Sequence, residues 1–156
     1  MTAAGISVAS YLRIADGEFV PVSEATVVPP DDRHIEGAIR LTVNGVDVLD
    51  TSLWDDVDQL WAYIATMIDG LAKSDRVSTY FPDQPIEFAI ERIGGRKVRV
   101  SADAREGKRT SVIEEDRLLS ALRTAGLDFF DAMSRLVPGN APTYRYSVQK
   151  LSTTLG

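Results

Sequence analysis

The chain has 156 residues, a net charge of −6 and no cysteine, which favours one domain spanning residues 1–156 in a reducing cytoplasm and excludes disulfides and thiolate chemistry. Polar residues interrupt its most apolar segment and its first ten residues lack a basic start, so neither a membrane helix nor a secretory signal is predicted. Residues 1–72 hold twelve acids and three arginines, a balance of −9, whereas residues 73–156 hold fourteen bases and eleven acids, a balance of +3.

The N-terminal segment has the period of a strand. Its apolar residues alternate with other residues: Ile6, Val8, Leu12 and Ile14. Asp16-Gly17 offers a turn, and Glu18 to Val22 is the expected short partner strand. The prolines between Val28 and Arg33 cannot continue a ladder, so that segment is predicted to be a loop.

Asn44-Gly45 predicts a β-hairpin, because this dipeptide suits the two-residue type I′ turn. Pairing across the turn places Val43 opposite Val46 and Leu41 opposite Val48. Three polar residues then share the other face: Arg40, Thr42 and Asp47.

A helix is predicted after this hairpin, with Thr51 or Ser52 as its cap and with Asp55 and Asp56 in its first turn. Its apolar stripe follows at helical spacing: Leu53, Val57, Leu60, Trp61, Ile64, Met67, Ile68 and Leu71. The stripe indicates a helix that lies on a sheet.

The same helix suggests an acidic contact surface. Asp55, Asp56 and Asp58 are expected to be exposed, because the apolar stripe faces the sheet. Together with Asp47 and Asp50 they would form a negative surface that steers a basic partner. The alternative is a solvated surface on which the charge is simply uneven.

The loop Tyr80-Phe81-Pro82-Asp83-Gln84-Pro85 is the second candidate contact surface. Its prolines stiffen the loop, and exposed aromatic rings are good anchors for a partner. Tyr80, Phe81, Asp83 and Gln84 are therefore candidate binding residues. The alternative is that both rings are buried beneath the helix.

A second hairpin is predicted between alternating segments at residues 86–91 and 98–103. A three-residue loop, Ile93-Gly94-Gly95, places Ile90 opposite Val98 and Phe88 opposite Val100, with Glu91 facing Lys97. The tips of both hairpins are expected to lie in one antiparallel sheet.

The C-terminal third predicts a polar loop at residues 105–109, and then a helix whose capping box is Ser111 with Glu114. Its stripe includes Leu118, Leu122, Ala125, Phe129, Met133 and Leu136. Gly126 inside the helix indicates a kink or a close helix contact, and Pro138-Gly139 ends the helix. Tyr144 to Val148 alternates and suggests an edge strand.

No motif in the chain predicts catalysis, a cofactor or a metal. His34, the only histidine, has Asp31, Asp32 and Glu36 nearby, which suggests either a metal site or general base or a solvated loop histidine. No nucleophile elbow or phosphate-binding loop accompanies it. The catalytic, cofactor and metal predictions are therefore none.

One basic cluster raises the question of nucleic-acid binding. It consists of Arg96, Lys97, Arg99, Arg105, Lys108 and Arg109. Tyr144 and Tyr146 would supply stacking if they lay nearby. The intervening acids and a sequence pI near 4.8 argue against a nucleic-acid partner.

The run from Gly37 to Ser101 resembles small bacterial immunity proteins of polymorphic toxin systems. The resemblance rests on Val43-Asn44-Gly45-Val46, the helix from Trp54 to Trp61, and Tyr80 to Pro85 leading into the strand that begins at Ile86. It implies a cytoplasmic protein that binds a cognate toxin and blocks it, without chemistry of its own.

The predicted fold is α+β, with an antiparallel sheet of five to seven strands packed against two helices. The predicted function is non-enzymatic binding of a protein partner, such as a basic toxin domain. Two alternatives remain open: a ligand-binding domain or enzyme with a pocket between sheet and helices, and a structural subunit of a phage or secretion assembly.

Overall fold

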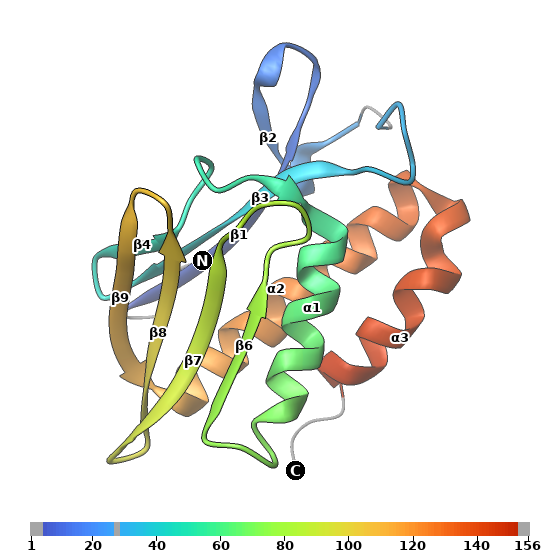
Figure 1. The fold of residues 1–156 in the computed structure, drawn as a ribbon. Coiled ribbons are helices and arrows are strands. Elements are labelled where there is room, and N and C mark those ends of the chain that lie inside the picture. The colour runs from blue at the N-terminus through green and yellow to red at the C-terminus, as the bar shows by residue number, and fades with distance from the viewer. Residues whose placement is uncertain (1–4, 27–28, 153–156) are drawn as a thin grey trace.

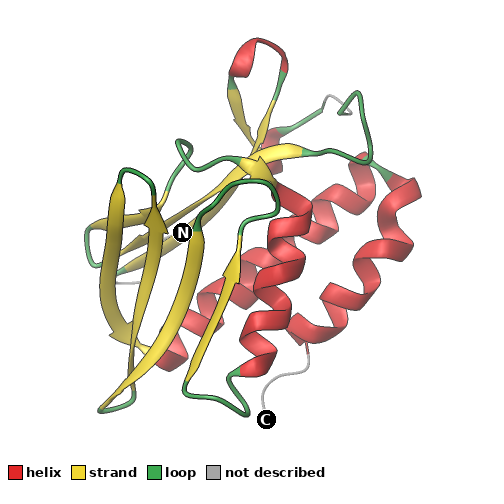
Figure 2. Cartoon of the chain, viewed as in Figure 1, coloured by secondary structure: helices red, strands yellow, loops and turns green. Residues whose placement is uncertain are grey.

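The computed structural model describes residues 5–26 and 29–152. Within these ranges, nine strands form two antiparallel sheets and three α-helices pack against them (Figures 1 and 2). The predicted α+β class is confirmed. The single sheet and the two helices are corrected to two sheets and three helices.

The first sheet has the strand order β2-β1-β3-β4, and the short β5 also pairs with β3. Its strands are β1 (Ile6–Arg13), β2 (Phe19–Pro21), β3 (Glu36–Val43), β4 (Val46–Leu49) and β5 (Asp55–Asp56). The hairpin of β1 and β2 is confirmed, and Asp16 and Gly17 both adopt positive φ in its turn. Of the predicted loop at 28–33, Val28 lies outside the described residues.

The Asn44-Gly45 turn is also confirmed. Both residues have positive φ, at 48° and 83°, and Val43 lies opposite Val46. The predicted pairing of Leu41 with Val48 is wrong, because a bulge places Leu41 opposite Leu49. The extra residue lets two consecutive apolar residues, Val48 and Leu49, both be buried.

The second sheet has the order β6-β7-β8-β9. Its strands are β6 (Arg76–Tyr80), β7 (Glu87–Gly94), β8 (Lys97–Ala104) and β9 (Gly107–Glu114). The hairpin of β7 and β8 exists, but Gly95-Arg96 forms its tip, with φ of 61° and 62°, and Ile90 lies opposite Val100. A bulge at Ile93 moves the register by two residues. A register shift of two residues leaves every side chain on the same face of the sheet, so the apolar pattern alone could not distinguish the observed register from the predicted one.

The capping box predicted at Ser111 and Glu114 is wrong, because both residues belong to β9. The ladder with β8 runs from Lys97 opposite Glu114 to Ala104 opposite Gly107, so the loop predicted at 105–109 is shortened to a turn at Arg105 and Glu106, and its last three residues belong to β9. The backbone bonds of this third antiparallel pairing outweigh the local preference of Ser111 for a helix start.

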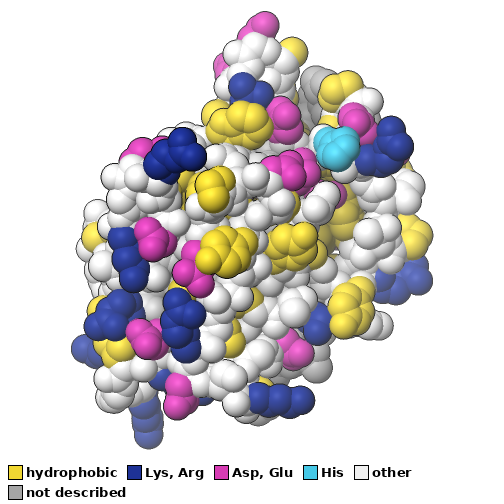
Figure 3. All heavy atoms as spheres, viewed as in Figure 1, with side chains coloured by type: hydrophobic (Ala, Val, Ile, Leu, Met, Phe, Trp, Pro, Cys, Tyr) yellow, Lys and Arg dark blue, Asp and Glu magenta, His cyan; other side chains and the backbone are white. Residues whose placement is uncertain are grey.

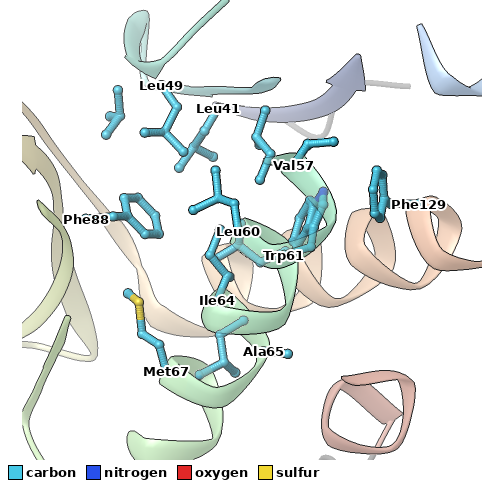
Figure 4. Packing of buried hydrophobic residues seen from close by; sticks show 14 of the residues in the cluster. Leu41, Leu49, Val57, Leu60, Trp61, Ile64, Ala65, Met67, Phe88 and Phe129 are labelled. Carbon is cyan, nitrogen blue, oxygen red and sulfur yellow. The ribbon is translucent and has the colours of Figure 1, made fainter. Parts of the chain in front are cut away.

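The first helix, α1 (Val57–Gly70), buries the predicted stripe between the sheets and the other helices. Figure 4 shows Leu60, Trp61 and Ile64 pointing from α1 toward Phe88 of β7 and Phe129 of the second helix. Neither Thr51 nor Ser52 caps α1. The helix begins at Val57 because Asp55 and Asp56 pair with β3 first.

Two further helices, α2 (Glu115–Leu136) and α3 (Ala141–Ser152), complete the helical layer. The predicted edge strand at Tyr144 to Val148 is wrong. Tyr144, Ser147 and Leu151 are buried at helical spacing, and a five-residue window did not separate this period from alternation. In the described part of the chain, three single-turn 3-10 segments connect elements, at Ala15–Gly17, Val22–Glu24 and Pro138–Asn140. No helix in the described ranges is long and apolar enough to span a membrane.

Side chains, rather than a backbone ladder, join the two sheets where β4 and β9 meet. The Asn44 amide donates to the Val112 carbonyl at 2.7 Å, and the Ser111 hydroxyl donates to the Val43 carbonyl at 2.9 Å. The two hairpin tips therefore lie in different sheets, contrary to the prediction.

The predicted close contact at Gly126 is confirmed. A Cβ there would lie 2.8 Å from Leu151 Cδ1 and 3.1 Å from the Trp61 ring, so α2 approaches its neighbours as only glycine allows. We expect Gly126→Ala to destabilise the protein by about 1 kcal/mol, because overpacking outweighs the gain in helix propensity. Urea unfolding measures this change. Gly139→Ala, which meets no atom within 4 Å, is the control, and equal stabilities for both variants would contradict the packing argument.

Candidate functional site

Three tyrosines stand out on the surface of the described residues. Tyr63 on α1 is 41% exposed, Tyr80 at the end of β6 is 63% exposed and Tyr146 on α3 is 65% exposed. The elements that carry them are neighbours, with α1 between β6 and α3. Figure 3 shows hydrophobic side chains gathered over this part of the molecule. We call the three residues the tyrosine face.

The loop that follows Tyr80 borders the tyrosine face and is fixed by a carboxylate. Asp55 accepts hydrogen bonds from the backbone N–H of Asp83 at 3.0 Å, of Gln84 at 3.0 Å and of Asp56 at 2.7 Å. The Gln84 side chain donates to the Trp54 carbonyl. Two N–H donors of the loop, from Asp83 and Gln84, hold it against the start of α1, which gives it one defined shape.

The predicted exposure of Asp55 and Asp56 is wrong, since their exposed fractions are 4% and 6%. Both residues precede α1 as strand β5, and this pairing turns them inward toward the loop. Sequence reasoning placed them in the first helical turn, where acids usually face solvent. Within the loop, Phe81 is buried and Tyr80 is exposed, so the alternative that both rings are buried is correct for one ring only.

Asp58 is half-buried and binds the third helix. Its carboxylate accepts a hydrogen bond from the Tyr144 hydroxyl at 3.0 Å. Burial raises the pKa of Asp58 above 3.8, against the lowering effect of this hydrogen bond. Burial also raises the pKa of Tyr144, so the phenol stays protonated and donates.

Asp47 and Asp50 are used within the fold as well. Asp47 binds Thr42 at 2.6 Å and Arg40 at 2.9 Å, and these bonds lower its pKa. Asp50 lies 3.0 Å from Arg109 of β9. Burial would raise the pKa of Asp50, but its hydrogen bonds from Ser52 and Arg109 outweigh that effect and lower it. The five predicted acids therefore do not form one exposed surface.

A small acidic cluster lies beside His34, the cyan residue in Figure 3. Carboxylate oxygens of Asp55, Asp56 and Asp83 lie within 4.8 Å of one another. Burial, followed by the charge of Asp83, raises the pKa of Asp56, and His34 Nδ1 lies 3.6 Å from Asp56. Both Asp55 oxygens already accept backbone N–H groups, so the cluster is explained by loop attachment.

The basic cluster predicted at residues 96–109 does not offer all its charges to a nucleic acid, because two of its arginines have acidic partners within the fold. Arg99 pairs with Glu91 at 3.3 Å and Arg109 with Asp50. Tyr144 is buried in the helical layer, so it cannot stack on a base beside β8 and β9.

Sequence reasoning identified Tyr80 but missed Tyr63 and Tyr146 as members of a surface. The apolar stripe of α1 does contain the signal, because Tyr63 lies off the stripe and must therefore face outward. The position of Tyr146 was hidden by the wrong strand prediction for the tail.

Comparison of the chain with protein-family models, curated proteins and solved structures found no match. The candidate site is therefore described from the contacts and exposure of its own residues.

The attachment of the loop by Asp55 is testable. Replacing Asp55 with Ala leaves three backbone donors without their acceptor, so we expect a loss of about 3 kcal/mol of unfolding free energy. The amides of Asp83 and Gln84 should also exchange faster with solvent. Asp83→Ala, which removes an exposed carboxylate and keeps those bonds, is the control. Unchanged amide exchange in Asp55→Ala would refute the attachment.

The bond between Tyr144 and Asp58 predicts a pH dependence. Without the hydroxyl, the ionised Asp58 is buried with one donor fewer, so Tyr144→Phe should cost about 2 kcal/mol at pH 7. Because the folded pKa of Asp58 is raised, it protonates first in the native state, and the cost should shrink as the pH falls toward 3.8. Denaturant titrations across this range measure it. The exposed Tyr146→Phe should show no loss at any pH, and a pH-independent loss in Tyr144→Phe would argue against a charged partner.

Proposed function

We propose that the chain is a non-enzymatic protein that binds another protein through the tyrosine face. The observation that carries the proposal is the exposure of Tyr63, Tyr80 and Tyr146 on three neighbouring elements of one fold. Tyrosine combines a large apolar ring with a polar hydroxyl, and it loses little side-chain entropy on binding, which makes it a frequent anchor of protein interfaces.

The attached loop supports the same proposal. A contact surface binds more tightly when its shape exists before the partner arrives, because less entropy is lost on association. Asp55 and Gln84 fix the loop next to Tyr80, and Phe81 anchors it from below. Asp83 remains exposed at this edge and offers a carboxylate to a basic group of the partner.

The finer proposal is that the partner is a toxin domain that the chain inhibits in the cytoplasm. It is supported by the resemblance of residues 37–101 to immunity proteins, by the absence of cysteine and by the net charge of −6, which suits a basic partner. In this proposal the rings supply the affinity, and the overall charge adds to the rate of encounter.

Site-specific photocrosslinking in the native host tests the binding surface. A photoreactive amino acid at position 63, 80 or 146 should trap one common partner, whereas the same group at the exposed positions 46 and 93 should not. With that partner purified, Tyr63→Ser and Tyr80→Ser should each weaken binding about tenfold or more, and Val46→Ser and Ile93→Ser should not. Equal trapping at all five positions, or equal affinities, would refute the tyrosine face.

A second candidate function, ligand binding, is favoured by one hollow. It has a volume of about 860 Å³ and lies between the β1–β2 hairpin and residues 29–36, with Arg13, His34 and Glu36 in its lining. This volume falls in the usual range of small-molecule sites. Arg13, however, already binds Glu36 at 3.0 Å and stacks on Trp54, so its charge is not free for a ligand. The tyrosine face therefore remains the preferred site.

A further inference from the structure

The N-terminal half of β1 has a neighbouring strand on only one side. The strand β3 pairs with β1 from Ile6 to Leu12, whereas β2 pairs only with Tyr11 to Arg13. Residues 6–10 are therefore a sheet edge, although the rest of β1 is internal to the sheet.

The alternation of hydrogen bonds between β1 and β3 shows which N–H and C=O groups of β1 point outward at this edge. The Asn44 N–H donates to the Gly5 carbonyl at 2.7 Å, so Gly5 and every second residue after it direct their main-chain groups toward β3. The N–H and C=O groups of Ile6 and Val8 therefore point away from β3. No residue that the structure describes makes a hydrogen bond to the N–H or C=O group of Ile6 or Val8.

A groove runs along this edge, between β1 and α2. Two hollows of about 630 and 480 Å³ share Val8, Ala125 and Asp128 in their linings, so they form one continuous groove. On α2 the groove is bordered by small side chains: Ser120, Ala121, Thr124 and Ala125. Small residues leave room for another backbone to approach β1.

The charges of the groove favour a basic occupant. Its two arginines each have an acidic partner, Arg117 with Glu114 at 3.3 Å and Arg135 with Asp131. Asp116 and Asp128 are exposed and have no ion-pair partner among the described residues. The groove therefore carries net negative charge next to unpaired main-chain groups.

We propose that an extended, basic segment of a partner protein binds in this groove as an added antiparallel or parallel strand on β1. Main-chain bonds to Ile6 and Val8 supply the pairing, and Asp116 and Asp128 select Lys or Arg side chains. A second copy of this chain fits less well, because each copy would bring the same two acids to the contact. About five residues, or roughly 17 Å of strand, fill the edge.

This surface is independent of the tyrosine face. In Figure 1, α2, which forms one wall of the groove, lies behind α1 and β6, so the two surfaces belong to different sides of the molecule. One partner can therefore occupy the groove while the tyrosine face is free.

Synthetic peptides of about eight residues provide the probe. The first alternates Val and Lys, the second replaces Lys with Glu, and the third has the first sequence with alternate backbone amides methylated. Isothermal titration against the full chain should show binding of the first peptide about tenfold or more tighter than of the other two. The amides of Ile6 and Val8 should become protected from exchange only with the first peptide.

Two variants locate the binding. Asp128→Lys on the exposed rim should weaken the Val-Lys peptide about tenfold and improve the Val-Glu peptide. Val8→Pro removes an N–H that the β3 ladder does not use, and it should abolish peptide binding while native circular dichroism is retained. Tyr63→Ser should leave peptide binding unchanged, which separates this proposal from the tyrosine face.

Four results would overturn the proposal. Three are equal affinity for the basic and the methylated peptide, no binding of the Val-Lys peptide at millimolar concentration, and protection of the Ile6 and Val8 amides in the free monomer. The last would mean that the chain itself covers the edge. A dimer in sedimentation that Val8→Pro dissociates would also overturn it, because a second copy would then be the occupant.

Discussion

The carboxylate of Asp55 is the contact on which the arrangement of the molecule most depends. It is buried, it is held in place by pairing of β5 with β3, and it accepts three backbone N–H groups. The pairing of β5 with β3 attaches the start of α1 to the first sheet, and the bonds from Asp83 and Gln84 attach the loop before β7 to Asp55. A buried charge is stable only when it is well hydrogen-bonded, so this carboxylate specifies one geometry rather than several.

Other acids of the first half of the chain also bind groups on neighbouring elements of the fold. Asp47 and Asp50 hold arginines of neighbouring strands, and Asp58 holds Tyr144 of α3. Charge that looks like a surface property in the sequence is thus largely a set of internal links between elements. The outer surface of α1 and its neighbours therefore offers a partner aromatic rings rather than carboxylates. We attribute the affinity for a partner to burial of these rings, and not to charge.

The sequence predicted local structure well where turn chemistry and periodicity agreed. Asn44-Gly45, the stripe of α1 and the close contact at Gly126 follow from backbone preference and from a long apolar period. Predictions failed where a distant partner decided the outcome. The pairing of β9 with β8 turned a helix cap at Ser111 into a strand, and the pairing of β5 with β3 turned Asp55 inward. Of the candidate site, Tyr80 was predictable, whereas its neighbours on α1 and α3 required the three-dimensional packing.

The open edge of β1 has a consequence for the solubility of the chain. Unpaired strand edges are templates for aggregation, and proteins usually block them with charges, bulges or covering elements. Here the β3–β4 turn and β9 are joined through Asn44 and Ser111, whereas residues 6–10 of β1 have a neighbouring strand on one side only among the described residues. Asp116 and Asp128 flank that stretch and act as gatekeepers, because identical molecules that approach edge to edge repel one another. Where both carboxylates are removed by substitution, this protection is lost and β1 becomes the site at which aggregation starts.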